Sequence, residues 1–111
     1  MTPERFAEIC TRFGLEITKY TYGVNDYVRY VAKKGNIIFA ECYRRERFDK
    51  YKTSCVAYIY LDSRTNKIRD DGGSEPCYIT SDLESKLTIL LKRYKDLMAK
   101  AKLKELDKDF F

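Results

Sequence analysis

The chain of 111 residues contains no histidine and no tryptophan, and only two prolines and five glycines. Histidine is the side chain that most often acts as a general base and as a metal ligand, so its absence argues against many hydrolase and metalloenzyme sites. No segment reaches the ~18 consecutive apolar residues that a membrane-spanning helix needs. The residues that follow Met1 also lack the pattern of a secretory signal. We therefore expect a cytoplasmic protein that does not bind a membrane.

Cysteine is present, but without the spacing of a metal site. Cys10, Cys42, Cys55 and Cys77 are widely separated, and no two of them form a C-x-x-C pair. This arrangement does not match structural zinc sites, and disulfide scaffolds are usually shorter and richer in cysteine. We expect four reduced thiols, mostly buried as small hydrophobic side chains.

Other motifs that carry chemistry are also missing. The segment 62–66 begins like a calcium-binding loop, but Arg64 stands where an oxygen ligand is needed. Gly72 and Gly73 are not followed by the lysine of a phosphate-binding loop. Asp70, Asp71 and Glu75 around these glycines could attract a cation, but we favour the explanation that they form an exposed polar loop. We expect a binding protein rather than an enzyme, with no metal, no cofactor and no catalytic residue.

Positive charge is concentrated in one segment of the chain. There are 22 basic and 17 acidic residues, which gives a net charge of +5. Residues 29–52 hold eight of the basic and three of the acidic residues, so the net charge of this segment equals that of the whole chain. A local basic patch raises both the association rate and the affinity for anionic partners.

The apolar pattern predicts a helix at each end of the chain and strands between them. Thr2, Pro3 and Gly14 are typical helix boundaries, which predicts a helix over 3–13. Ser81 and Glu84 form a capping-box pattern before a long helix that reaches about residue 106. Strand patterns begin at Leu15 and continue at 27–33, 37–44, 55–61 and 67–69, with a tight turn at 34–36 and a loop at 70–76.

These elements predict one α+β domain over residues 1–111, in the order α-β-β-β-β-β-α. Short connections favour a single antiparallel sheet of about four to five strands, with the short N-terminal and the long C-terminal helix packed on one face. The second helix would be roughly 37 Å long, about twice the reach of a short strand. We therefore expect it to extend past the sheet or to pack on a second copy of itself.

Alternation along the strands assigns side chains to the two faces of the sheet. Glu41 should not point into a core, so its side of the strand 37–44 is expected to be the outer one. The inner face then consists of small side chains, namely Ala40, Cys42, Cys55 and Ala57. The outer face collects mostly aromatic side chains, namely Tyr20, Tyr22, Tyr27, Arg29, Phe39, Tyr43, Tyr58 and Tyr60.

Beside this outer face, residues 43–52 interleave basic and aromatic side chains. Arginine binds phosphate and stacks on planar groups, and aromatic rings stack on bases, so we favour nucleic-acid binding, with a preference for single strands. The expected phosphate contacts are Arg44, Arg45, Arg47, Lys50 and Lys52. The expected base contacts are Phe39, Tyr43, Tyr58 and Tyr60, with Arg29 in either role.

The same residues also suit a protein partner with an acidic surface. Tyrosine and arginine are the usual anchors of protein interfaces, and Glu46 and Asp49 interrupt the basic run. On this hypothesis the protein is a small inhibitor of a larger complex, of the kind that phages encode. A homodimer through the long helix or through the aromatic face is a further alternative, and the connection 45–52 could instead cover that face.

Overall fold

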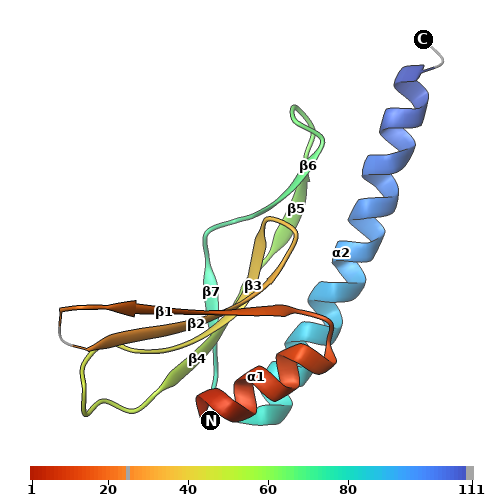
Figure 1. The fold of residues 1–111 in the computed structure, drawn as a ribbon. Helices are drawn as coiled ribbons and strands as arrows, with labels where there is room; N and C mark the ends of the chain where they lie inside the picture. Colours follow the sequence, from red (N-terminus) through yellow and green to blue (C-terminus); the bar gives the residue numbers. More distant parts are fainter. Residues whose placement is uncertain (25, 110–111) are drawn as a thin grey trace.

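A computed structural model describes residues 1–24 and 26–109. Its elements, in chain order, are α1 (Pro3–Arg12), β1 (Glu16–Tyr22), β2 (Tyr27–Lys34), β3 (Ile37–Arg44), β4 (Lys52–Val56), β5 (Ile59–Asp62), β6 (Lys67–Asp70), β7 (Ser74–Cys77) and α2 (Thr80–Asp109). The predicted α+β fold, with a short first helix and a long last helix, is confirmed (Figure 1). The structure contains two strands more than the predicted order.

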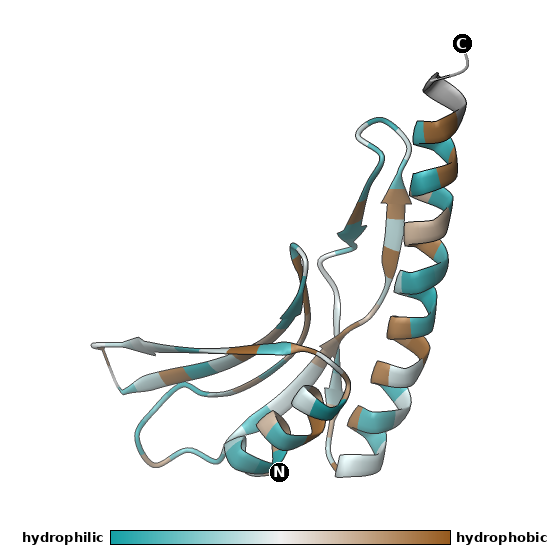
Figure 2. Cartoon of the chain, turned by 45° about the vertical axis from the view of Figure 1, so that its right-hand side comes forward, coloured by the Kyte–Doolittle hydropathy of each residue, from teal (hydrophilic) through white to brown (hydrophobic). Residues whose placement is uncertain are grey.

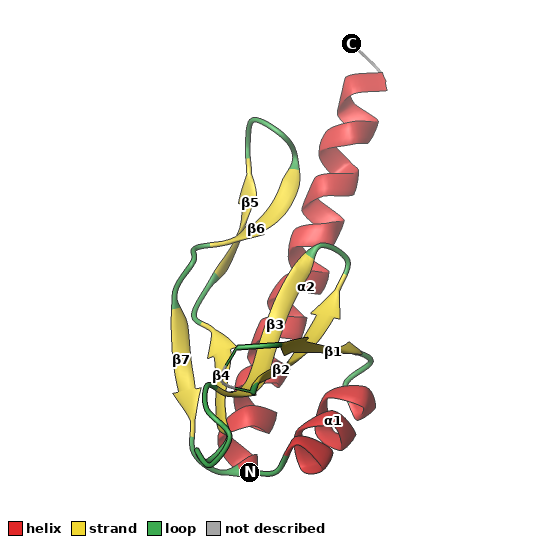
Figure 3. Ribbon diagram, turned by 60° about the vertical axis from the view of Figure 1, so that its left-hand side comes forward, coloured by secondary structure: helices red, strands yellow, loops and turns green. Residues whose placement is uncertain are grey.

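The strands form a five-stranded antiparallel sheet in the order β1-β2-β3-β4-β7 and a separate two-stranded ribbon of β5 and β6. The ribbon leaves the sheet and runs beside α2 (Figures 1 and 3). The prediction of one continuous strand over 55–61 is therefore wrong, because β4 ends at Val56 and β5 begins at Ile59. The predicted loop 70–76 is also wrong in part, since it contains most of β7. Pro76 is compatible with β7 because that strand lies at the edge of the sheet.

Strands β4, β5, β6 and β7 form one long hairpin that bends in the middle. Its first arm is β4 followed by β5, and its second arm is β6 followed by β7. Between its halves the Ala57 amide donates to the Gly73 carbonyl at 3.1 Å, and the Asp71 amide donates to the Tyr58 carbonyl at 3.1 Å. Gly72 lies in the bend at a φ of +80°, where a residue with a side chain is strained. The bend directs the end of the hairpin away from the sheet and toward α2.

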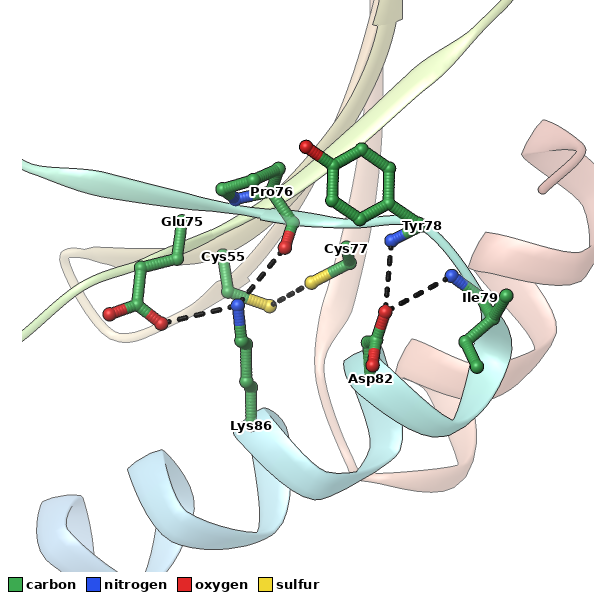
Figure 4. A network of polar contacts seen from close by, with 8 residues as sticks. All are labelled: Cys55, Glu75, Pro76, Cys77, Tyr78, Ile79, Asp82 and Lys86. Carbon is green, nitrogen blue, oxygen red and sulfur yellow. Dashed lines mark hydrogen bonds and ion pairs between the residues drawn. The ribbon is translucent and has the colours of Figure 1, made fainter.

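The helix boundaries are set by local hydrogen bonds. The Thr2 hydroxyl accepts from the Arg5 amide at 3.2 Å, as predicted for an N-cap. At the start of α2 the predicted role of Ser81 is wrong. Asp82 Oδ2 instead accepts from the amides of Tyr78 and Ile79, at 3.1 and 3.3 Å (Figure 4). Neither helix within the described residues is both long and apolar enough to cross a membrane.

The core lies between the sheet and the two helices, with large helix side chains against small strand side chains. Phe6, Ile9, Leu83 and Leu87 are completely buried on the helices. They share one cluster with the strand residues Ala40, Cys42 and Cys55. Large helix side chains thus pack against small strand side chains, as the sequence predicts. Figure 2 shows apolar stretches of α2 facing the ribbon as well.

A β-bulge in β3 alters the predicted faces. Ala32 pairs with Ala40 but Lys33 pairs with Ile38, so Phe39 is an extra residue. Phe39 is completely buried, and its ring meets the ring of Tyr94 on α2 edge to face at 5.5 Å between centroids. The prediction that Phe39 lies on the outer face is therefore wrong, while Glu41, beyond the bulge, pairs in register with Val31 and Ser54.

Candidate binding groove on the outer sheet face

The sheet face opposite the helices carries several of the predicted binding residues. Strand register places Arg29 opposite Tyr43, and Tyr43 opposite Lys52, so all three side chains share that face. Tyr20 and Tyr22 of β1 pair with Arg29 and Tyr27 of β2 and join the same face. The predicted outer face is thus correct for the residues of β1 and β2 and for the second half of β3.

A groove of about 580 Å³ lies at one end of this face and is the candidate site. Tyrosine and basic side chains line it, among them Tyr27, Tyr43, Arg45, Lys52 and Tyr78. We call this site the outer-face groove. A smaller hollow of about 220 Å³ adjoins it and shares Glu41, Ser54 and Ser74 with it. Tyr78 was not predicted as a site residue, because it follows a segment that the sequence pattern assigns to a loop.

Two basic residues of the groove make no ion pair within the described part of the chain, whereas the arginine that borders the adjoining hollow does make one. Arg45 and Lys52 are exposed and unpaired there. Arg29, which borders the adjoining hollow, donates from Nε to Glu41 Oε2 at 2.6 Å. Burial disfavours the charge of Arg29, but the hydrogen bond and the charge of Glu41 outweigh it, so the pKa of Arg29 is raised. Arg29 therefore stays charged, but Glu41 compensates that charge, whereas Arg45 has no such partner among the described residues.

The predicted basic run does not form one surface. Arg44 pairs in register with Val28, so it points to the face opposite Tyr43. Its guanidinium lies 5.2 Å from the ring centroid of Tyr51, and its Nε is buried without a hydrogen-bond partner among the described residues. Arg44 therefore lies on the helix side of the sheet, whereas Arg45 follows the end of β3 and lines the outer-face groove.

The connection between β3 and β4 lies beside the turn between β1 and β2 rather than across the groove. Arg47 pairs with Asp26 at 3.9 Å, and its guanidinium lies 5.6 Å from the ring centroid of Phe48. Phe48 is 93% exposed, and Lys50 is exposed as well. Arg47 and Lys50, which the sequence predicts as phosphate contacts, therefore do not line the outer-face groove.

Tyr58 and Tyr60 are not on the sheet, so the prediction that they share its outer face is wrong. Tyr58 lies in the bend of the long hairpin, between β4 and β5, and Tyr60 is in β5. Arg93 of α2 stacks on Tyr58, with 4.3 Å from guanidinium carbon to ring centroid, and donates a hydrogen bond to its hydroxyl. Arg93 Nε also donates to the Ile59 carbonyl at 2.6 Å. Tyr58 thus helps hold the ribbon to α2.

No metal centre is evident in the described residues. They contain no group of three or more Cys, Asp or Glu side chains placed to hold an ion. Asp62, in the segment that resembles the start of a calcium loop, accepts from the Arg64 amide at 2.9 Å and pairs with Arg69 at 3.0 Å. These contacts, the backbone hydrogen bond first, lower the pKa of Asp62.

No family model matches this chain. Neither the curated proteins nor the solved structures include a significant match to it. The case for a function therefore depends on the groove itself.

Proposed function

We propose that the protein binds single-stranded nucleic acid in the outer-face groove. One observation carries this proposal: four tyrosines border one groove on the sheet face that the helices leave open, together with two basic residues that make no ion pair among the described residues. They are Tyr27, Tyr43, Tyr51 and Tyr78, with Arg45 and Lys52. Of the residues predicted from the sequence, Phe39 is excluded from this proposal because it is buried.

The chemistry of the groove suits a strand whose bases are unpaired. Aromatic side chains stack on bases at about 1–3 kcal/mol each, whatever the base. This stacking requires an exposed base face, which a duplex does not provide along its length. Arg45 and Lys52 would contact the phosphates on either side of the stacked bases, and phosphate contacts supply affinity without sequence preference.

The salt dependence of binding tests this assignment. Fluorescence anisotropy would be measured with labelled single-stranded RNA, single-stranded DNA and duplex DNA over about 50–200 mM salt. The variant Arg45→Ala/Lys52→Ala should bind single strands more weakly, with a salt slope reduced by about 1.4, since each phosphate contact contributes about 0.7.

A matched control replaces one arginine and one lysine outside the groove. Arg64 and Lys67 are exposed at the turn of the ribbon, so Arg64→Ala/Lys67→Ala removes the same charge there. The control variant should bind single strands with the same salt slope as the unchanged protein. Equal losses in both double variants would show that only the overall charge matters, and the groove would lose its assignment.

A protein partner is the second candidate, and the edge of the sheet favours it. β1 lies at the edge of the sheet, and its residues Lys19–Tyr22 are exposed. An extended segment of a partner can add to such an edge through backbone hydrogen bonds. Nucleic-acid binding that is weak, equal for all three probes and indifferent to the tyrosines would favour this candidate.

A further inference from the structure

Two cysteine thiols meet in the core under the outer-face groove. Cys55 in β4 and Cys77 in β7 lie on neighbouring antiparallel strands, where Cys77 pairs in register with Thr53. Their Sγ atoms are 3.4 Å apart and in hydrogen-bond contact (Figure 4). The sulfurs of a disulfide are about 2.05 Å apart, so the two Sγ atoms must approach each other by about 1.3 Å to form a covalent bond. β7 can make such a shift because its other edge is free.

A lysine lies beside this pair and favours a thiolate. Lys86 of α2 donates from Nζ to the Pro76 carbonyl at 3.0 Å and pairs with Glu75 at 3.1 Å, next to Cys77 (Figure 4). The hydrogen bond with Cys55 and the charge of Lys86 lower the pKa of Cys77, whereas burial and the carboxylates of Asp82 and Glu75 oppose them. The same contact and burial raise the pKa of Cys55. Cys77 also lines the outer-face groove, and we assign it as the nucleophile of the pair.

Among the described residues, the other two cysteines make no such sulfur–sulfur contact with a lysine beside it. Cys10 and Cys42 are completely buried, and burial raises the pKa of both, that of Cys10 to about 12. Neither borders the outer-face groove or the adjoining hollow. Cys55 and Cys77 are buried too, at 1% and 4% exposed, but Cys77 is a lining residue of the outer-face groove, which gives a small oxidant its route to this pair.

We propose that Cys55 and Cys77 are an oxidation site at which hydrogen peroxide forms a disulfide between β4 and β7. The Cys77 thiolate attacks one peroxide oxygen and the O–O bond breaks. This gives a sulfenic acid at Cys77 and, with one proton, a water molecule. The Cys55 sulfur then attacks the Cys77 sulfur, and the hydroxide that leaves takes the Cys55 proton to form a second water. Two thiols are oxidised and one peroxide is reduced.

The disulfide would close the hairpin that carries the ribbon. It would fix the edge strand β7 to β4 and restrict the chain segment between them in the unfolded state, which raises the melting temperature. This proposal is independent of nucleic-acid binding, since it concerns the core side of β4 and β7.

Peptide mapping of the full-length protein tests the proposal. The folded protein is treated with hydrogen peroxide, remaining thiols are alkylated in denaturant, and the digest is analysed by mass spectrometry. The expected product is a single Cys55–Cys77 disulfide, with Cys10 and Cys42 alkylated. Thiols that all remain reduced, or disulfides that join other cysteines or two chains, would overturn the proposal.

Two variants separate the chemistry from folding. Lys86→Met should shift the pH midpoint of disulfide formation upward, because the thiolate loses its neighbouring charge. Cys42→Ala is the matched control and should oxidise at the rate of the unchanged protein. The mapping of the unchanged protein stands even if a cysteine variant at 55 or 77 fails to fold.

Discussion

Arg29 borders the smaller hollow and Arg45 lines the outer-face groove, and their charges are available to a ligand to different degrees. Arg29 is held by Glu41 at 2.6 Å, and both side chains are less than one-third exposed. Arg45 is exposed and has no ion-pair partner among the described residues. We therefore infer that Arg29 and Glu41 shape the floor of the face, while Arg45 makes the contact with a phosphate.

Tyr78 is the residue at which stacking can be tested most cleanly. Its side chain is 79% exposed, so its removal should have little effect on stability. Tyr78→Ala should weaken binding of single strands by about 1–3 kcal/mol, as measured by fluorescence anisotropy at fixed salt. Tyr60→Ala, which removes an exposed tyrosine of the ribbon, is the control and should bind like the unchanged protein. A Tyr78 variant that binds normally would remove Tyr78 from the site.

Phe39 illustrates which single-residue features the sequence does not reveal. The argument from Glu41 assigns the correct face to Glu41 and Tyr43, because strict alternation holds beyond the bulge. One extra residue before Ala40 turns Phe39 toward Tyr94. The bulge depends on how β2 and β3 meet the helices, and no glycine or proline within β3 signals it.

At the scale of elements, the ribbon of β5 and β6 is attached to α2 rather than to the sheet. Arg93 contacts Tyr58 and the Ile59 carbonyl, and Asn66 Nδ2 donates to the Ala101 carbonyl at 2.9 Å. Ile59 is completely buried and belongs to the main core. The long helix thus has a partner for part of the length that the sheet cannot cover.

The contribution of the ribbon can be measured by substitution within one strand. Ile59→Ala should lower the free energy of unfolding by about 2–5 kcal/mol, because it leaves a cavity between β5 and α2. Tyr60→Ala, at the next position and exposed, should cost far less. Urea unfolding followed by circular dichroism compares the two. Similar losses would mean that the ribbon packs loosely on the helix.

Local signals predicted some elements and failed for others. The Thr2 cap, the turn at Gly35 and the end of α1 before Gly14 follow from single residues, and Gly35 and Gly14 have φ angles of +60° and +80°. The bend between β4 and β5 and the existence of β7 depend on packing against α2. A run such as 55–61 has the same apolar character whether it stays in one sheet or divides between two.

At the scale of the whole molecule, the long helix determines the shape. The molecule measures 58 × 30 × 20 Å, and α2, with 30 residues, is roughly 45 Å long. The basic segment predicted as one patch is divided between two sheet faces and a connecting loop, so the candidate site keeps two of its five predicted phosphate contacts. That the chain forms one domain stays a prediction, and the shared core of sheet, ribbon and helices supports it.

The bent hairpin also has a consequence for the route by which the chain folds. The Asn66 amide donates to the Asp62 carbonyl at 2.8 Å and closes the turn, whereas Thr53 and Cys77 pair at the far end of the arms. Loop-closure entropy favours pairing that spreads outward from the turn. In pulsed hydrogen exchange, the Asn66 amide should gain protection before the Ala57 amide, which donates to the Gly73 carbonyl farther from the turn. Earlier protection of the Ala57 amide would contradict this order. Until β7 arrives, the edge of β4 is an open template on which another chain can pair and aggregate.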